Sequence, residues 1–359
     1  MPPVPVGALL RRTIPPTFRW PLKFCAYTTL TCYVLSVITG NASQVDRVWT
    51  FLPTIYTAYY ALLPLWPWSS PLPLYPYVPR DVPRRIVMDM SPRALMMLGL
   101  QVVWMLRLSY NTWRRGLFNF HDEDYRWQIV RNKVPKWLFQ IFNLTFIAIA
   151  QNIILFLLGL PAHIASTQPH TSLAPSDYIL GALALLTLLG EFIADNQQYS
   201  FQTYKQTGFL NTDEWPGARI RWTQEDAKRG FVTRGLWAWS RHPNFFCEQT
   251  FWVIQTLIPL LAPGDPHLPK RLPTSESSLT PFWPLTPALV LCMLFLSSTR
   301  FTESISLGKY PEAYRAYQAR VSMFVPVLTP VWGLLLKLNG NKERVEVVVW
   351  GKGEEKKRD

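Results

Sequence analysis

The sequence predicts an all-α protein: a polytopic membrane helix bundle of about six to eight membrane segments, with basic loops facing the cytosol. Of its 359 residues, 49% are apolar and only 16% are charged, whereas soluble domains carry about 25% charged residues. The apolar residues gather into blocks of spanning or near-spanning length. Lys and Arg gather in the short loops between these blocks, which is typical of a membrane protein and accounts for the net charge of +13 without a nucleic-acid partner.

The blocks follow one another along the whole chain. The clearest is Trp137 to Leu160, which has no charged residue and exceeds the roughly 20 residues needed to cross a bilayer. The weaker candidates are 22–40, 49–68, 94–106, 178–194, 245–262 and 285–298, and 323–336 is short and interrupted by two prolines.

Loop charges set the expected orientation. Residues 107–136 and 205–241 are rich in Lys and Arg and are expected in the cytosol, whereas 161–177 carries neither and is expected on the opposite side. The alternation fails upstream, because the basic stretch 80–85 also looks cytosolic. We therefore expect 94–106 to be re-entrant or paired with a missed span, and Asn41, in an Asn-Ala-Ser glycosylation motif, to face the lumen.

The termini and the cysteines complete the organisation. Residues 1–93 are predicted to form Pro-rich segments and the first membrane helices, 94–338 the main membrane domain and 339–359 a charged cytosolic tail. Lys356 and Lys357 resemble a dilysine signal for the endoplasmic reticulum. No cleavable signal peptide is expected, and the four cysteines have no metal-binding spacing and are read as buried small hydrophobes.

Two segments place polar groups on one face of an apolar helix. Arg241, Asn244 and Glu248 are spaced by three and four, and so are Glu191, Asp195 and Gln198. A carboxylate facing lipid is costly, so these faces predict one shared buried site. The alternatives are that Glu248 only pairs with a cation, and that Asp195 only reaches cytosolic water.

The motif "GLWAWSRHPNFFCEQTFW" (235–252) resembles the signature of the steroid 5-alpha-reductase-like proteins of the DUF1295 group. The resemblance covers roughly residues 107–326 and includes "RLSYNTWRRG", "EDYRW", "ADNQQ" and "FTESISLGKYPEAYRAYQARV". It implies a membrane bundle that encloses NADPH and delivers hydride to a conjugated double bond of a steroid or other lipid. Phe245 and Cys247 depart from the reductases' Asn-Tyr-Phe-Gly-Glu motif.

The resemblance also implies roles for individual residues. Asn244, Glu248 and Asp195 would face the cofactor, as would Glu303 and Tyr310 in the last matched segment. Arg241, Arg107 and Arg300 lie beside the polar segments and are expected to hold the phosphates, because guanidinium binds phosphate oxygens in pairs. The remaining cofactor candidates are Gln198 and His242, and the nearest candidate for a catalytic acid is Tyr110.

Several interpretations stay open. His242 either donates to a phosphate or ends a loop and bonds the backbone, and Tyr110 is equally well explained as an interfacial tyrosine. Isoprenylcysteine methyltransferases carry a related Arg-His-Pro motif, so S-adenosylmethionine is the alternative cofactor. A non-catalytic lipid-binding protein that kept the fold is the third possibility.

Overall fold

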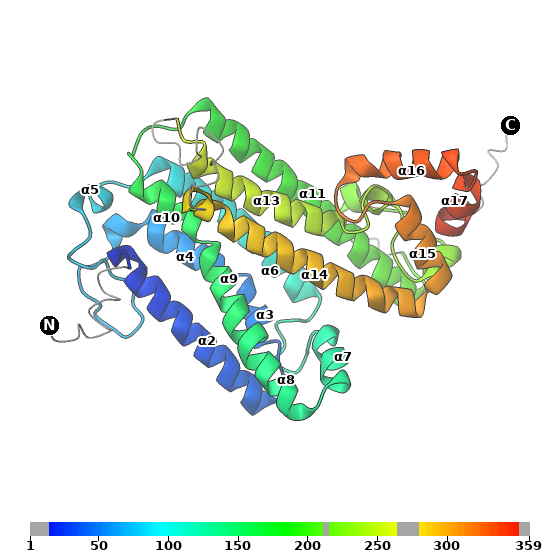
Figure 1. Ribbon diagram of the computed structural model, residues 1–359, viewed down its shortest axis with the longest axis horizontal. Helices are drawn as coiled ribbons and strands as arrows, with labels where there is room; N and C mark the ends of the chain where they lie inside the picture. The colour runs from blue at the N-terminus through cyan, green and yellow to red at the C-terminus, as the bar shows by residue number, and fades with distance from the viewer. Residues whose placement is uncertain (1–13, 211–214, 264–279, 352–359) are drawn as a thin grey trace. The chain divides into compact units, whose positions relative to one another are not determined.

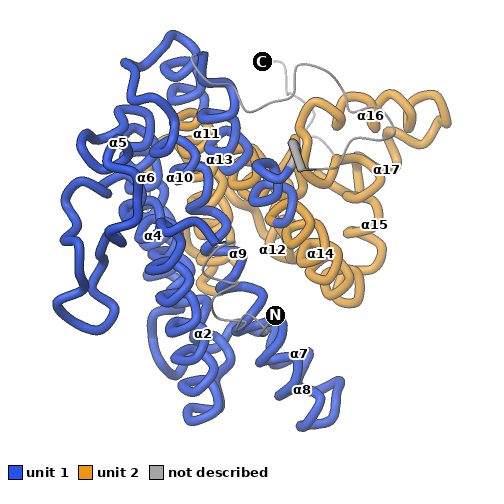
Figure 2. Tube along the Cα trace, turned by 60° about the vertical axis from the view of Figure 1, so that its left-hand side comes forward, with its two compact units in different colours: residues 1–183, 252–290 blue, residues 184–251, 291–359 orange. Residues whose placement is uncertain are grey.

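The structure is a computed structural model that describes residues 14–210, 215–263 and 280–351, and within these residues it contains helices and no strand. The chain forms two compact units, shown in two colours in Figure 2. Unit 1 comprises residues 1–183 and 252–290, and unit 2 comprises 184–251 and 291–359. Three long helices run from one unit into the other: α11 (Pro175–Thr207), α13 (Pro243–Leu260) and α14 (Thr286–Lys309).

Unit 1 holds the N-terminal helices (Figure 1). Helix α2 packs along the continuous helical stretch α8–η3–α9, whose middle part is π-helical, and α4 packs against α6 and α10. Its core includes Tyr56, Leu155 and Phe139. The elements are η1 (Pro16–Phe18), α2 (Arg19–Thr39), α3 (Gln44–Trp49), α4 (Leu52–Ala61), η2 (Leu63–Leu65), α5 (Arg84–Val87), α6 (Pro92–Arg114), α7 (Tyr125–Lys133), α8 (Lys136–Phe142), η3 (Asn143–Ala150), α9 (Gln151–Leu157) and α10 (Leu160–Thr167).

Unit 2 holds the C-terminal helices and the segment with the Arg-His-Pro-Asn motif. Helices α15 and α17 pack on each other around Tyr317 and Val349, and a second small core forms around Phe201 and Trp222. The short elements of this unit are η4 (Pro216–Ala218), α12 (Gln224–Arg229), η5 (Gly235–Ala238), α15 (Pro311–Arg320), η7 (Pro326–Leu328), α16 (Thr329–Leu338) and α17 (Lys342–Trp350), and η6 (Thr280–Leu285) precedes α14.

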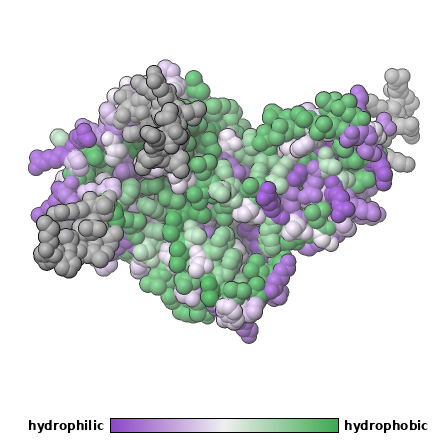
Figure 3. All heavy atoms as spheres, in the orientation of Figure 1, coloured by the Kyte–Doolittle hydropathy of each residue, from purple (hydrophilic) through white to green (hydrophobic). Residues whose placement is uncertain are grey.

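The predicted helical membrane protein is confirmed. Four helices in the described part of the chain are long and apolar enough to cross a membrane: Pro16–Thr39, Lys136–Thr167, Pro175–Thr207 and Trp283–Lys309. Hydrophobic side chains gather along the long helices on the face drawn in Figure 3. Helix α6 covers the weaker candidate 94–106, and α13 covers 245–260 of the candidate 245–262. The candidate 323–336 overlaps the short apolar helix Pro326–Leu338. The candidate 49–68 is wrong as a single helix, because it divides into α4 and η2.

One end of unit 1 joins three segments. Arg19 forms an ion pair with Asp81, Ser91 donates to the carbonyl of Ala165, and Arg93 forms a buried bidentate pair with Asp177 at 2.9 Å. The basic stretch 80–85 therefore lies at the same end as 161–177. The 23-residue α6 runs unbroken from this end to the basic segment 107–136. The two basic stretches therefore lie at opposite ends of this helix, and the side of the membrane that each one faces stays a prediction.

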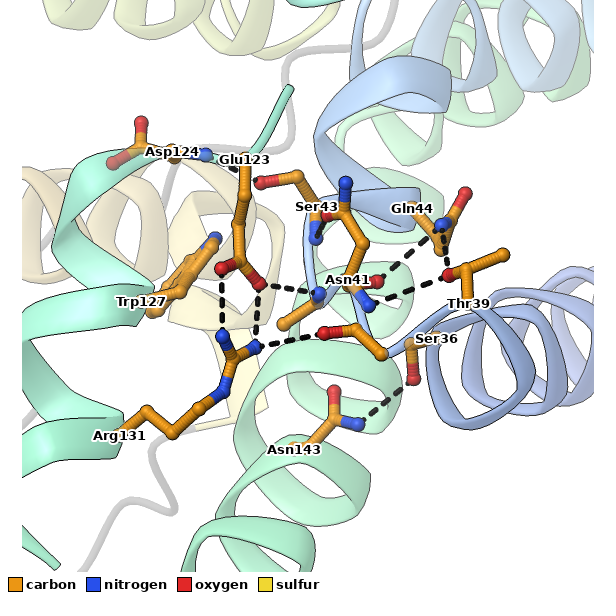
Figure 4. Close-up of polar contacts among 12 residues, drawn as sticks. Ser36, Thr39, Asn41, Ser43, Gln44, Glu123, Asp124, Trp127, Arg131 and Asn143 are labelled. Carbon is orange, nitrogen blue, oxygen red and sulfur yellow. Dashed lines mark hydrogen bonds and ion pairs between the residues drawn. The ribbon is translucent and has the colours of Figure 1, made fainter. Parts of the chain in front are cut away.

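The other end of unit 1 is drawn in Figure 4. Asn41 donates from its amide nitrogen to the carbonyls of Phe120 and Asp122, both at 3.0 Å, and is 7% exposed. Arg131 donates to Glu123 and to the carbonyl of Gly40. Asn41 thus lies on the same side as the basic segment 107–136, so its lumenal assignment is inconsistent with a cytosolic assignment of that segment.

Candidate functional site

The predicted polar faces meet in unit 2, where α11 passes α13. Asn244 donates from its amide to a carboxylate oxygen of Asp195 at 3.1 Å. Glu191 lies one turn before Asp195 and Glu248 one turn after Asn244, and the three carboxylates are 3–6% exposed. A side chain on Gly190 would approach the sulfur of Cys247 to 3.1 Å, so a glycine here lets the two helices approach closely. Helix α11, which is long and apolar enough to cross a membrane, and helix α13 thus bury three carboxylates beside an amide.

Gln198, the last member of the predicted face on α11, is only partly buried. Its neighbour Gln197, which the spacing argument passed over, is 6% exposed and accepts from the backbone N–H of Leu236 at 2.9 Å. The contact needs a glycine at position 235, where φ is +66° and a Cβ would lie 2.6 Å from the Gln197 amide. The Gly-Leu-Trp sequence could have indicated this contact. A glycine with positive φ makes a turn that leaves the next backbone N–H available to an acceptor such as Gln197.

Arg241 and His242 belong to a second cluster in unit 2, centred on Glu303 of α14. Arg241 donates to Glu303 from Nε at 2.7 Å and from a terminal nitrogen at 3.1 Å, and His242 Nε2 lies 3.0 Å from the same carboxylate. Gln318 donates its amide to Glu303 at 2.8 Å. The other terminal nitrogen of Arg241 donates to the carbonyls of Gln318 and Val321. Every nitrogen of this guanidinium is therefore used inside the fold.

Burial lowers the pKa of His242, and this effect outweighs the nearby Glu303, which acts in the opposite direction. His242 is thus a neutral imidazole whose Nε2–H is directed at the carboxylate. Its side chain bonds Glu303 of the same chain, and its ring stacks on Phe245 with ring centres 5.5 Å apart. Its backbone N–H bonds the carbonyl of Met323. The motif is fastened to the segment that follows α15.

The remaining candidates lie elsewhere. The ring of Tyr310 occupies the space where a side chain on Gly230 would lie, and its hydroxyl accepts from Lys205 at 3.1 Å. Arg300 is exposed on α14. Arg107 and Tyr110 are on α6 in unit 1, with Arg107 8% and Tyr110 46% exposed.

The structure therefore joins Asp195 to Asn244, and Arg241 to His242 and Glu303, within unit 2. Tyr310 is tied to Lys205 instead.

No group of three or more His, Cys, Asp or Glu side chains suited to a metal ion occurs among the described residues.

The comparisons with known proteins agree with the motif. The model of the family described as "protein of unknown function (DUF1295)" matches residues 32–321. A protein of Schizosaccharomyces pombe, "Uncharacterized protein C594.04c", is 35% identical over 296 residues, which cover 82% of this chain and 75% of that protein. No solved structure matches. The chain is thus a helical, multi-pass membrane protein that belongs to the DUF1295 family.

Proposed function

We propose that this protein is a membrane-embedded, NADPH-dependent reductase that acts on a conjugated double bond of a steroid or another lipid. The observation that carries the proposal is the buried polar face of α11 and α13, with Asp195, Asn244, Glu191 and Glu248. A helix with membrane-spanning surface retains such groups at a cost, and it does so where they meet partners or a ligand.

The donor set fits part of NADPH. Carboxylates such as Asp195 and Glu248 accept hydrogen bonds from ribose hydroxyls, and an amide such as Asn244 suits the carboxamide of nicotinamide. When bound, the cofactor supplies a hydride. Gln198, partly buried two turns before the end of α11, stays within this proposal.

Arg241 does not fit the phosphates, because all its nitrogens donate within the fold. Exposed cations of the same unit, Arg221, Lys228 and Arg300, are better suited to an anionic group. Arg107 remains a proposed contact on α6. In this proposal the phosphates of the cofactor are bound by exposed cations instead of Arg241. Because salt screens exposed charges, cofactor binding should weaken as the salt concentration rises.

Reduction of an enone also requires a proton donor, since hydride addition develops enolate charge. We propose Tyr110 for this role. Its phenol is half exposed on α6, and the guanidinium of Arg114 lies 5.1 Å from its ring centre. A Tyr110→Phe variant should bind cofactor normally and lose turnover, which distinguishes a proton donor from an interfacial tyrosine.

The test of the proposal is cofactor binding, followed by quenching of tryptophan emission in the detergent-solubilised protein. We expect saturable quenching by NADPH, with NADH about tenfold weaker because it lacks the 2'-phosphate. Glu248→Gln should weaken binding while the melting temperature stays near that of the wild type. The exposed Glu312→Gln is the matched control and should bind normally. Absence of saturable NADPH quenching would reject the reductase.

A second candidate is an S-adenosylmethionine-dependent methyltransferase acting on a lipid. It is favoured by one observation: the buried face carries three carboxylates, whereas Arg241 is committed to Glu303. Carboxylates suit a cationic sulfonium cofactor that has no phosphate. Saturable binding of S-adenosylmethionine in the same assay, without response to NADPH, would select it. If neither NADPH nor S-adenosylmethionine binds in this assay, a non-catalytic lipid-binding protein would be favoured.

We further propose the endoplasmic reticulum membrane, with a cytosolic C-terminus, as the location. The argument is the dilysine pattern of Lys356 and Lys357, which lie outside the described residues. Replacing both lysines by serine in a tagged full-length chain should move it out of the reticulum. Retention of the variant there would contradict the dilysine argument.

A further inference from the structure

Helix α16 of unit 2 presents a wide apolar face. One side of the helix packs on α15 and α17, and hydrophobic side chains cover α16 on the face drawn in Figure 3. Its ten residues include five large hydrophobic side chains that are 40–74% exposed: Val331, Trp332, Leu334, Leu335 and Leu338. Just before the helix, Val325, Val327 and Leu328 are 38–75% exposed. The fold of unit 2 thus leaves half of the residues of this helix as exposed apolar surface.

The opposite side of α16 is fastened by Arg320, at the end of α15. This guanidinium donates to the carbonyl of Thr329 at 3.2 Å and to the carboxylate of Glu346 at 2.8 Å, and it lies 5.0 Å from the ring centre of Trp350. A Cβ on Gly333 would lie 3.1 Å from the guanidinium, so the glycine lets the helix approach it closely. These contacts hold the helix in one orientation, with its apolar face directed away from the rest of unit 2.

The charges beside this face have one sign. Residues 321–342 contain Lys337 and Lys342 and no Asp or Glu. Lys342 pairs with Glu346 of its own helix at 3.8 Å. Lys337 is exposed and follows Leu334 by three residues, so it borders the apolar face. If a second copy of the chain covered the face around a two-fold axis, the same surface of both copies would meet. That contact would bring lysines together without an acidic partner from this segment, whereas lipid headgroups carry phosphates.

Helix α16 is too short to cross a membrane. Its ten residues span about 15 Å, which is about half of the hydrocarbon thickness of a bilayer. A helix with one apolar side and one polar side lies in the plane of the interface, with the apolar side about 5–10 Å deep at the boundary between headgroups and acyl chains. Unit 2 is also attached to the bilayer, because α14, which is long and apolar enough to cross it, ends at Lys309 and is followed by α15 at Pro311.

We propose that α16 lies flat in the surface of the membrane, with its apolar face among the lipid chains next to the headgroups and with Lys337 at the lipid phosphates. Trp332 suits this depth, because tryptophan is enriched at membrane–water interfaces. In this proposal the sequence candidate 323–336 is a surface segment instead of a span. The proposal concerns lipid contact alone, so it can fail while the reductase proposal stands, and the converse also holds.

The experiment places the environment-sensitive fluorophore NBD on an introduced cysteine. Leu335→Cys lies in the middle of the apolar face, and the control Glu343→Cys is exposed on α17 of the same unit. The full chain is reconstituted as a single copy in phosphatidylcholine nanodiscs, and the labelled native chain, with its four cysteines, supplies the background. Quenching is measured with phosphatidylcholines that carry a nitroxide either near the headgroup end of the acyl chain or near its methyl end.

We expect the label at Leu335→Cys to emit at a shorter wavelength than the label at Glu343→Cys, because its surroundings are apolar. The nitroxide near the headgroup should remove most of its emission, and the nitroxide near the methyl end should remove much less. The label at Glu343→Cys should respond weakly to both lipids.

Stronger quenching of the Leu335→Cys label by the methyl-end nitroxide would overturn the proposal, because α16 would then reach the middle of the bilayer. Emission at the wavelength of the control, without quenching, would also overturn it, because the helix would then face water. Emission at a shorter wavelength without quenching by either lipid would mean that protein covers the face, which contradicts lipid contact. Should the labelled Leu335→Cys chain fail to give a cooperative melt, Val331→Cys, one turn earlier on the same face, takes its place.

Discussion

Replacing Arg241 by leucine should lower the stability of unit 2, and it should remove no direct contact with a cofactor. The guanidinium is 7% exposed and donates to both oxygens of Glu303 and to two backbone carbonyls. Its loss leaves the Glu303 carboxylate buried beside His242, Gln318 and Tyr314, without the cation that neutralises it. Breaking a buried pair in this way costs about 3–5 kcal/mol.

The assay is thermal unfolding of the purified protein in detergent, measured with and without NADPH. At about 2–4 °C per kcal/mol for a folding unit of this size, the expected fall in Tm is on the order of 10 °C. The double variant Arg241→Leu with Glu303→Leu should recover most of the loss, because replacing both partners by apolar groups is close to neutral. An Arg241→Leu protein that melts within 2 °C of the wild type and has lost NADPH binding would refute this reasoning. It would restore Arg241 as a phosphate ligand.

Three more outcomes follow from the contacts described. Burial holds the pKa of His242 below its ordinary 6.5, so the folded chain keeps it neutral while the unfolded chain protonates. This contribution to the free energy of unfolding should therefore be full above about pH 6.5 and fall as the pH drops below it, by up to about 1.4 kcal/mol per pH unit until the folded pKa is passed. In thermal melts measured over a series of pH values, His242→Gln should lack this part of the pH dependence. The same pH dependence in the variant and the wild type would contradict the assignment. Asn41, whose amide is bonded twice, should carry no glycan, so glycosidase treatment and Asn41→Gln should leave electrophoretic mobility unchanged. In intact microsomes a cysteine at exposed His121 should react with an impermeant maleimide above the background of the native chain, and one at exposed Arg85 should not; equal reaction would contradict the separation of the two ends of unit 1.

The sequence predicted the membrane helices well because apolar length is a local property. It did less well at α6, where Arg93 enters the first turn of the helix and weakens the apolar pattern. Asp177, which neutralises this arginine in a buried pair, is 84 residues away. Such a pairing is invisible until the fold brings the two groups together, and so the candidate 94–106 was shorter than the helix Pro92–Arg114.

The polar site shows the same limit. Spacing by three and four identified Asp195 and Asn244, which do meet, because a helix face is fixed by its own period. It could not tell that Arg241 turns away from this pair to Glu303 of α14, since that choice depends on α14 and α15. Gln197 was missed because its partner is a backbone N–H exposed by the Gly235 turn.

The Arg241–Glu303 contact holds two parts of the scaffold together. Both residues lie within the segment that the family model matches, and the pair fastens the start of α13 to α14 whatever molecule is processed. The Arg-His-Pro segment of this chain is then a structural joint, and it is compatible with either of the proposed cofactors. A motif search that finds it recovers ancestry and architecture, and the assignment of chemistry has to come from the side chains that the joint leaves free.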